Sequence, residues 1–133
     1  MKKILFVHDV QEDPTLRKSH LESVGFQVTA CETADDCLAK MNEQKFDLVL
    51  MDILLKGLNG FDLTRQLRAR HSPEDLPILL GCSIYRQRIH REEAYAAGAQ
   101  GYILRPVDLE ELVRDMRTLI GISESLVSAR EAS

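Results

Sequence analysis

The stretch DLVLMDILL, residues 47–55, decides the fold of this chain. Its continuous apolar run, residues 48–51, is typical of a strand that is buried on both faces of a parallel sheet. An ionised carboxylate is costly inside such a strand, so we expect Asp52 at the carboxyl end. In open α/β sheets, that edge is where ligands bind. The stretch therefore predicts a parallel sheet with an acid at its functional edge.

Strand-like runs recur along the chain, and a helical pattern follows each of them. The five runs are residues 4–7, 27–31, 48–51, 78–80 and 102–104. Strict alternation with short connections predicts right-handed crossovers and helices on both faces of the sheet. We therefore expect an α/β, flavodoxin-like, doubly wound (βα)5 fold with five parallel strands in the order 2-1-3-4-5. Because this order makes the first and third strands neighbours, it brings His8 and Asp9 next to Asp52.

Helix signals support this division of the chain. Asp13-Pro14 predicts a cap and a first-turn proline for the first helix, whose apolar residues are Leu16, Leu21 and Val24. The fifth helix has an apolar stripe that ends at Ile120. We expect one domain over residues 1–121, and a polar tail over residues 122–133 that is either a frayed helix or the start of a linker.

Composition excludes several classes of protein. A chain of 133 residues is large enough for one self-sufficient core, and its net charge of −4 gives no global electrostatic case for direct nucleic-acid binding. No apolar stretch is long enough to span a bilayer, so we expect no membrane partner. The three cysteines are odd in number and lack CxxC spacing, which favours reduced thiols and a cytoplasmic location.

The order and spacing of several short motifs resemble those of a known family. Residues 47–53, with Gly60 eight residues after Asp52, are similar to the phosphoacceptor strand and loop of response regulator receiver domains. Residues 97–102 and Arg105-Pro106 resemble the turn and fifth strand of the same family. The resemblance covers residues 2–121.

The resemblance implies a switch rather than an enzyme. Asp52 would accept a phosphoryl group from a histidine kinase or a phosphotransfer protein. Mg²⁺ would be the cofactor, and Asp9, Asp52 and the backbone carbonyl of Leu54 would be its protein ligands. This is a ligand set of the kind that Mg²⁺ prefers, since it combines carboxylates with a carbonyl and leaves room for water and phosphate.

The family also has a hydroxyl at the end of its fourth strand, which bonds the phosphoryl oxygen. Counting back from Arg105 assigns this role to Ser83, whereas counting forward from Pro77 assigns it to Cys82. We favour Ser83, because a thiol is a weak hydrogen-bond donor. Tyr102 resembles the signalling aromatic of the family, and a partly buried strand tyrosine is the alternative interpretation.

The resemblance further implies that the fourth helix, the fifth strand and the fifth helix form a switching interaction surface. Its output partner is not specified by the sequence, and a second copy of the chain, giving a homodimer, is one candidate.

Three positions depart from the family pattern. His8 stands where the family has a second acid, and imidazole is a poor Mg²⁺ ligand, so we expect His8 to weaken Mg²⁺ binding. Arg105 replaces the family's lysine, and it could hold the phosphoryl group or lock Asp52 in a resting salt bridge. Lys56 replaces a loop proline. These departures motivate an alternative hypothesis, a pseudo-receiver that acts as a protein-interaction module without phosphorylation.

A third class, an enzyme on the same fold, fits the residues poorly. The loop at residues 9–13 is acidic and has no glycine, so it is unsuited to cradling a phosphate. Asp52 also has no second acid two residues later to serve as an acid/base.

Overall fold

The structure is a computed structural model of the chain, and it describes residues 1–9, 13–53, 55, 59–82, 88–104 and 108–132. One parallel sheet lies at the centre, with the strand order β2-β1-β3-β4-β5. The strands are β1 (Lys3–Val7), β2 (Gln27–Cys31), β3 (Leu48–Asp52), β4 (Ile78–Cys82) and β5 (Gly101–Leu104). The predicted flavodoxin-like fold class and strand order are confirmed.

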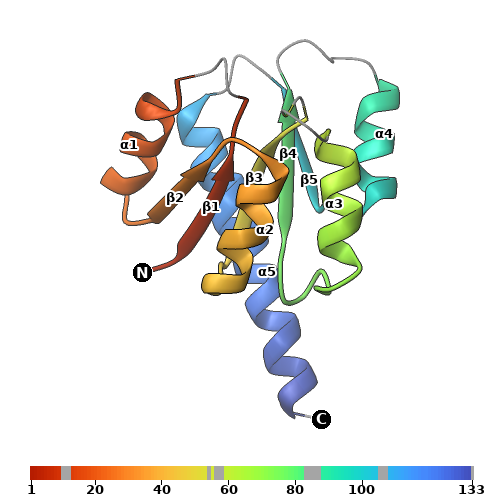
Figure 1. Cartoon of the computed structure of the whole chain (residues 1–133). Coiled ribbons are helices and arrows are strands. Elements are labelled where there is room, and N and C mark those ends of the chain that lie inside the picture. Colours follow the sequence, from red (N-terminus) through yellow and green to blue (C-terminus); the bar gives the residue numbers. More distant parts are fainter. Residues whose placement is uncertain (10–12, 54, 56–58, 83–87, 105–107, 133) are drawn as a thin grey trace.

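Within the described residues, five helices cover the two faces of the sheet (Figure 1). They are α1 (Thr15–Ser23), α2 (Ala34–Glu43), α3 (Gly60–Arg68), α4 (Arg88–Ala97) and α5 (Leu109–Ala132). Helices α1 and α5 pack on one face, and α2, α3 and α4 pack on the other. This arrangement is the doubly wound form that alternating strands and helices require.

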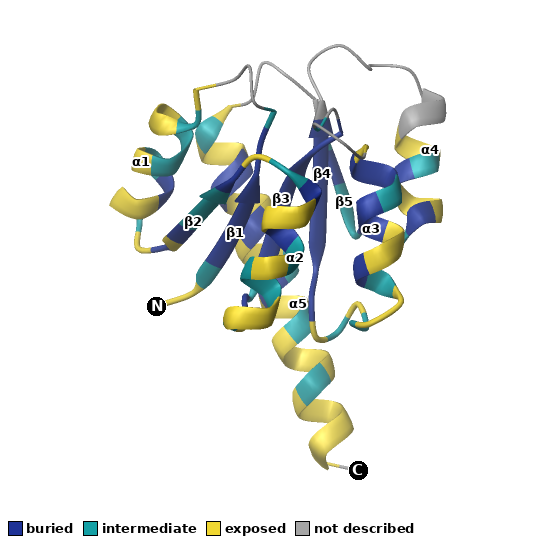
Figure 2. Cartoon of the chain, in the orientation of Figure 1, coloured by how far each residue is buried: buried dark blue, intermediate teal, exposed yellow. Residues whose placement is uncertain are grey.

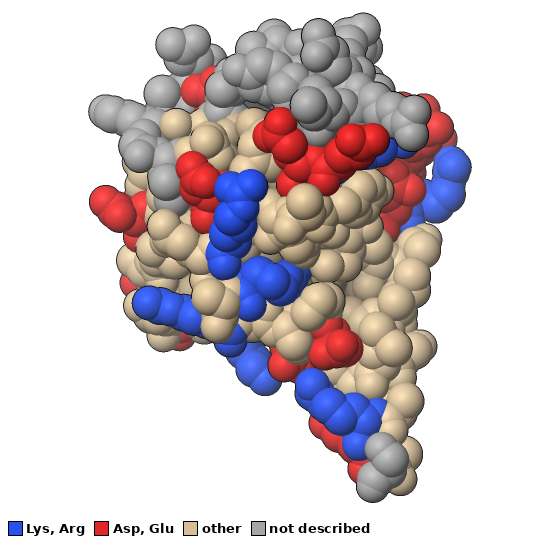
Figure 3. All heavy atoms as spheres, turned by 90° about the vertical axis from the view of Figure 1, so that its right-hand side faces the viewer, with Lys and Arg blue, Asp and Glu red and all other residues tan. Residues whose placement is uncertain are grey.

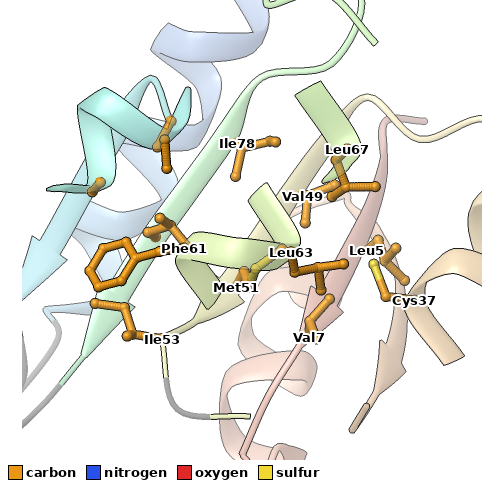
Figure 4. Packing of buried hydrophobic residues seen from close by; sticks show 14 of the residues in the cluster. Leu5, Val7, Cys37, Val49, Met51, Ile53, Phe61, Leu63, Leu67 and Ile78 are labelled. Carbon is orange, nitrogen blue, oxygen red and sulfur yellow. The ribbon is translucent and has the colours of Figure 1, made fainter. Parts of the chain in front are cut away.

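The core consists of two clusters, one on each face of the sheet, because successive side chains of a strand point to opposite faces. In β1, Ile4 and Phe6 join the cluster under α1 and α5, whereas Leu5 and Val7 join the cluster under the other three helices. Every residue of β3 is buried (Figure 2). Figure 4 shows the second cluster, in which Met51 of β3 lies near residues of α3.

Side-chain caps fix the starts of α2 and α3. Thr33 Oγ1 accepts a hydrogen bond from the Asp36 amide at 3.0 Å, which is the backbone contact of a capping box. Asn59 Oδ1 accepts from the Asp62 amide at 2.9 Å and so begins α3 after the loop that follows β3. Both helices are thus anchored by short-range signals that can be identified in the sequence.

The first helix differs from its prediction in two ways. Pro14 precedes the first turn as the N-cap residue, and Asp13 Oδ1 accepts instead from the Thr15 amide at 2.9 Å and from the Thr15 hydroxyl at 2.6 Å. These hydrogen bonds hold the pKa of the Asp13 carboxyl below its ordinary value. Leu16 is 75% exposed, so it is not part of the apolar face, which contains Leu21.

Helix α5 continues through most of the segment that was predicted as a polar tail. Residues 122–132 are helical, and this part of α5 extends beyond the sheet with mostly exposed side chains (Figure 2). Arg130 Nη2 lies 3.0 Å from Asp75 Oδ1 in the connection between α3 and β4. The boundary at residue 121 between domain and tail stays a prediction.

In the described part of the chain, no helix is both long enough and apolar enough to cross a membrane. Cys31 and Cys37 are free and buried, and contact with the Cys37 thiol together with burial raises the pKa of the Cys31 thiol.

Candidate functional site at the carboxyl edge of the sheet

Asp52 is the last residue of β3, and its side chain is buried at the carboxyl edge of the sheet. Val7 of β1 pairs with Met51 of β3. The next residues along the chain, His8 and Asp52, are therefore neighbours. On its other side, Asp52 pairs with Gly81 of β4. The register therefore brings the ends of three strands together around this acid.

Strand alternation determines which helices Asp52 faces. Leu48 and Leu50, which precede it by four and two residues, belong to the cluster under α1 and α5. Because residues two apart in a strand point to the same face, Asp52 is on the same face of the sheet as these leucines. By the same rule, His8 is on the same face as Phe6 of β1. Both site residues therefore lie on the α1 side of the sheet, which is why α1 contributes to the site.

The start of the loop after β1 contacts Asp52 directly. The backbone amide of Asp9 donates a hydrogen bond to Asp52 Oδ2 at 3.0 Å. His8 is 3% exposed, and its Nδ1 lies 2.9 Å from the backbone carbonyl oxygen of Asp9. A carbonyl can only accept, so Nδ1 carries the proton in this hydrogen bond. His8 thus supports the backbone that presents Asp9 to Asp52.

Arg17 of α1 is a site residue that the sequence analysis missed. Its Nη1 lies 3.9 Å from Asp52 Oδ1, and its guanidinium carbon lies 5.1 Å from the centroid of the Phe6 ring. Its side chain is 12% exposed. No sequence pattern marked this position. The structure shows that Arg17 precedes the fully buried Leu21 by four residues, so both lie on the helix face turned toward the sheet.

Gly60 brings the start of α3 against the end of β3. Its amide donates to the Ile53 carbonyl oxygen at 2.6 Å. A Cβ atom at this position would lie 2.6 Å from the Asp52 carbonyl oxygen, which is closer than a real side chain allows. The glycine that follows Asp52 by eight residues is therefore required by the close approach of two backbones.

The donor chemistry at this edge fits Mg²⁺. Asp9 and Asp52 supply two carboxylates, which is the number that Mg²⁺ usually takes before carbonyls and water complete its shell. Across the described residues, no group of three or more His, Cys, Asp and Glu side chains could hold a metal ion. A site that depended on several imidazole or thiolate ligands would therefore not be formed by the described part of the chain.

Several predicted site residues lie outside the described residues: Leu54, Lys56, Ser83 and Arg105. Cys82, the alternative to Ser83, is the last residue of β4 and pairs with Leu104. The choice between Ser83 and Cys82 therefore stays open, as does the role of Arg105.

Tyr102 lies in β5, opposite Leu80, and is 8% exposed. Near it, a cavity of about 230 Å³ is lined by residues of α4, β5 and α5, among them Tyr95, Tyr102 and Leu119. Tyr95 is 49% exposed. Figure 3 shows the face that carries α4, where acidic side chains gather across the upper part of the described surface and a largely uncharged area lies below them. The predicted interaction surface thus includes a hollow beside a buried tyrosine.

The chain matches one protein family over most of its length. The response regulator receiver domain model matches residues 4–117. Protein PilH from Pseudomonas aeruginosa is 32% identical over 120 residues, which cover 90% of this chain and 98% of PilH. Other curated relatives are longer, and this chain spans about half of their length.

Solved structures of receiver domains have the same fold. The receiver domain of the sensor histidine kinase PA1611 from P. aeruginosa PAO1 is 30% identical, with a TM-score of 0.79 over 90% of this chain and 98% of that chain. That structure has a magnesium ion coordinated in its active site cleft. A CheY-like receiver domain protein from Methanospirillum hungatei has a TM-score of 0.85 at 26% identity, over 94% of this chain and 98% of that chain.

The strand order and the acid at the end of β3 define a CheY-like flavodoxin fold. The chain belongs to the response regulator receiver domain family, a family of two-component signalling proteins.

Proposed function

We propose that this chain is a non-catalytic phosphorylation switch that accepts a phosphoryl group on Asp52 from a histidine kinase or a phosphotransfer protein. The observation that carries the proposal is the arrangement of Asp52 itself. Its carboxylate is buried at the carboxyl edge of β3, and its Oδ2 is fixed by the Asp9 amide. A fixed carboxylate can be held in line with an incoming phosphoryl group, which is the main requirement for phosphoryl transfer.

The transfer would join an Asp52 carboxylate oxygen to phosphorus as the phosphorus–nitrogen bond of the donor phosphohistidine breaks. The donor imidazole keeps the electron pair of that bond. Asp9 and Asp52, with the carbonyl of Leu54, would hold Mg²⁺, which offsets charge on the phosphoryl oxygens. The Asp9 amide keeps Oδ2 in place, and Ser83 and Arg105 are proposed to contact the phosphoryl group.

The output would be a change at the surface formed by α4, β5 and α5. The 230 Å³ cavity beside Tyr102 supports this proposal, because a buried side chain next to a hollow has space into which it can move. Added charge and acceptor oxygens at Asp52 would bias this surface between two packings. The exposed Tyr95 on the same surface offers a contact for an output partner or for a second copy of the chain.

The test is incubation of the protein with acetyl phosphate and MgCl2, followed by intact-mass spectrometry. We expect a labile adduct with the mass of one phosphoryl group, which is absent when Mg²⁺ is chelated and absent in Asp52→Asn. Asp62→Asn is the matched control, because Asp62 is an acid of α3 whose side chain is 45% exposed and pairs with Arg65. Failure of the wild-type protein to form the adduct, with this small donor and with a phosphorylated histidine kinase, would support the phosphorylation-independent module instead.

A further inference from the structure

Arg17 places a positive charge against the carboxylate that is proposed to bind both the phosphoryl group and Mg²⁺. The Arg17 and Asp52 side chains are 12% and 8% exposed, so solvent screens their interaction only partly. The contact is to Oδ1, whereas the Asp9 amide bonds Oδ2. Both carboxylate oxygens therefore have partners from the protein itself.

We propose that Arg17 is a tethered cation that pairs with Asp52 in the resting protein and competes with a divalent cation for this carboxylate. The inference rests on the proposed function, since it takes Asp9 and Asp52 as the ligands of the cation. Arg17 therefore does not bind the cation itself. It sets how much Mg²⁺ is needed to occupy the site.

The packing of Arg17 keeps the guanidinium at the site. Its guanidinium carbon lies over the Phe6 ring, 5.1 Å from the ring centroid, and Phe6 is fully buried in β1. The Phe6 ring lies in turn 5.4 Å from the His8 ring. Leu21, one helical turn after Arg17, is fully buried and fixes this face of α1 against the sheet. A cation that enters beside Asp52 therefore meets a positive charge that is held in place.

Charge repulsion gives the direction of the effect. The side chains of Asp9, Asp52 and Arg17 together carry one net negative charge, and neutralising Arg17 leaves two. Mg²⁺ should then bind more tightly, by about tenfold for charges a few ångströms apart in a partly screened site. A residue that served only to pack α1 against the sheet would not change the Mg²⁺ affinity in this direction.

The experiment compares Arg17→Met with the wild-type protein and with Arg117→Met. Arg117 is a matched control, because its guanidinium also stacks on a phenylalanine, Phe26, at 5.8 Å, and its Nη2 donates to the Val24 carbonyl, outside the site. MgCl2 is titrated while backbone amide chemical shifts near Asp9 and Asp52 are recorded. Thermal unfolding with and without MgCl2 gives a second measure, since a tighter ligand stabilises the folded state more.

We expect the Kd for Mg²⁺ to fall about tenfold in Arg17→Met and to stay unchanged in Arg117→Met. Arg17→Lys keeps the charge, so its Kd should stay close to that of the wild-type protein. Arg17→Gln removes the charge but keeps a polar group, and it replaces Arg17→Met if that variant does not fold.

Equal Mg²⁺ affinity in the wild-type protein and in the neutral variants would overturn the inference, and so would the absence of Mg²⁺ binding from all of them. A different result would contradict the proposed function but not the role of Arg17. If the neutral variants bind Mg²⁺ more tightly but no variant forms the acetyl phosphate adduct, Arg17 opposes the cation as proposed and Asp52 is not a phosphoacceptor.

Discussion

At the scale of single residues, the contact between Gly60 and the end of β3 limits what the site can accept. The Gly60 amide bonds the Ile53 carbonyl, and the Asp52 carbonyl occupies the space that a Cβ atom would need. The backbone of β3 and the first turn of α3 are therefore packed without a side chain between them. Any methyl group inserted here must move one of the two backbones.

We accordingly expect Gly60→Ala to lower the free energy of unfolding by about 1–3 kcal/mol, the usual cost of overpacking. The same change should slow the formation of the acetyl phosphate adduct, because it displaces Asp52. Urea unfolding and the adduct assay measure the two effects.

Gly121→Ala is the control for this substitution. Gly121 lies within α5, and a Cβ atom there would meet nothing within 4 Å. Alanine should therefore raise stability at this position, by about 0.5–1 kcal/mol, because it favours the helix. If Gly60→Ala proved as well tolerated as Gly121→Ala, this result would contradict the close packing of Gly60 against the end of β3.

Only some of the residues at the site could be located from the sequence. Asp52, Asp9 and His8 could be located, because strand ends and strand order follow from local patterns. Arg17 could not be identified, because its role depends on how α1 is rotated against the sheet. Leu16 suggested a different apolar face for α1, yet it is exposed, and the buried Leu21 determines the actual rotation.

At the scale of elements, Arg68 ties together two connections on the α3–α4 side of the sheet. It is the last residue of α3, and its guanidinium donates to the carbonyl oxygens of Gly98, Leu76 and His71 at 2.7–3.1 Å. It also donates to Gln100 Oε1 at 2.7 Å. Burial lowers the pKa of this guanidinium from its ordinary value. The end of α3, the start of β4 and the start of β5 are thus joined by one side chain.

We expect Arg68→Met to lower the free energy of unfolding by about 2–4 kcal/mol, because it removes the guanidinium that donates to the partly buried Leu76 and His71 carbonyl groups. Arg68→Lys should recover only part of the loss, since an ammonium lacks the planar fork that reaches several acceptors.

Arg65→Met is the matched control for Arg68. Arg65 lies one turn earlier on α3, its side chain is 54% exposed, and it forms an i,i+3 ion pair with Asp62, an arrangement that contributes little to stability. Urea unfolding of the three variants checks the prediction. Equal losses in Arg65→Met and Arg68→Met would contradict the role assigned to the buried guanidinium.

Local signals were sufficient for most elements. Thr33 and Asn59 cap the helices that follow them, and the apolar run at residues 48–51 forms β3. The strands are one or two residues longer than predicted in places, as in β4, which continues to Cys82. Strand pairing continues past the apolar run because backbone hydrogen bonds do not require apolar side chains.

At the scale of the whole molecule, the last turns of α5 extend past the edge of the sheet that lies opposite Asp52 (Figure 1). Arg130 pairs there with Asp75, and Lys2 Nζ lies 3.1 Å from Glu124 Oε1. The Ser123 hydroxyl donates to the Glu74 carbonyl oxygen. These polar contacts, rather than a buried apolar stripe, hold the end of α5, which is why the hydrophobic pattern of the sequence underestimated the length of the helix.

The Arg130 guanidinium and the Ser72 hydroxyl hold the pKa of the Asp75 carboxyl below its ordinary value near 3.8. A carboxyl whose pKa is lower in the folded state stabilises that state above its unfolded pKa, and this contribution is lost as the pH falls through the folded pKa. We therefore expect wild-type protein to be more stable than Asp75→Asn at pH 7, and this difference to disappear as the pH falls below 3.8.

Urea unfolding of both proteins across this pH range measures the difference. Arg130→Gln should remove most of the advantage of Asp75 at pH 7, because the ion pair supplies the largest part of the shift. A pH-independent difference between wild-type protein and Asp75→Asn would contradict this account.

The direction of α5 has a practical consequence for handling the protein. Because the five strands are parallel and α5 runs back beside them, the start of β1 and the end of α5 both lie on the amino-edge side of the sheet, opposite the edge that carries Asp52 (Figure 1). A biotin tag or a fluorescent label attached after Ala132 would therefore orient an immobilised molecule with its acidic edge toward the solution. Surface-based binding experiments with phosphodonor proteins can use this attachment point without covering the site that they probe.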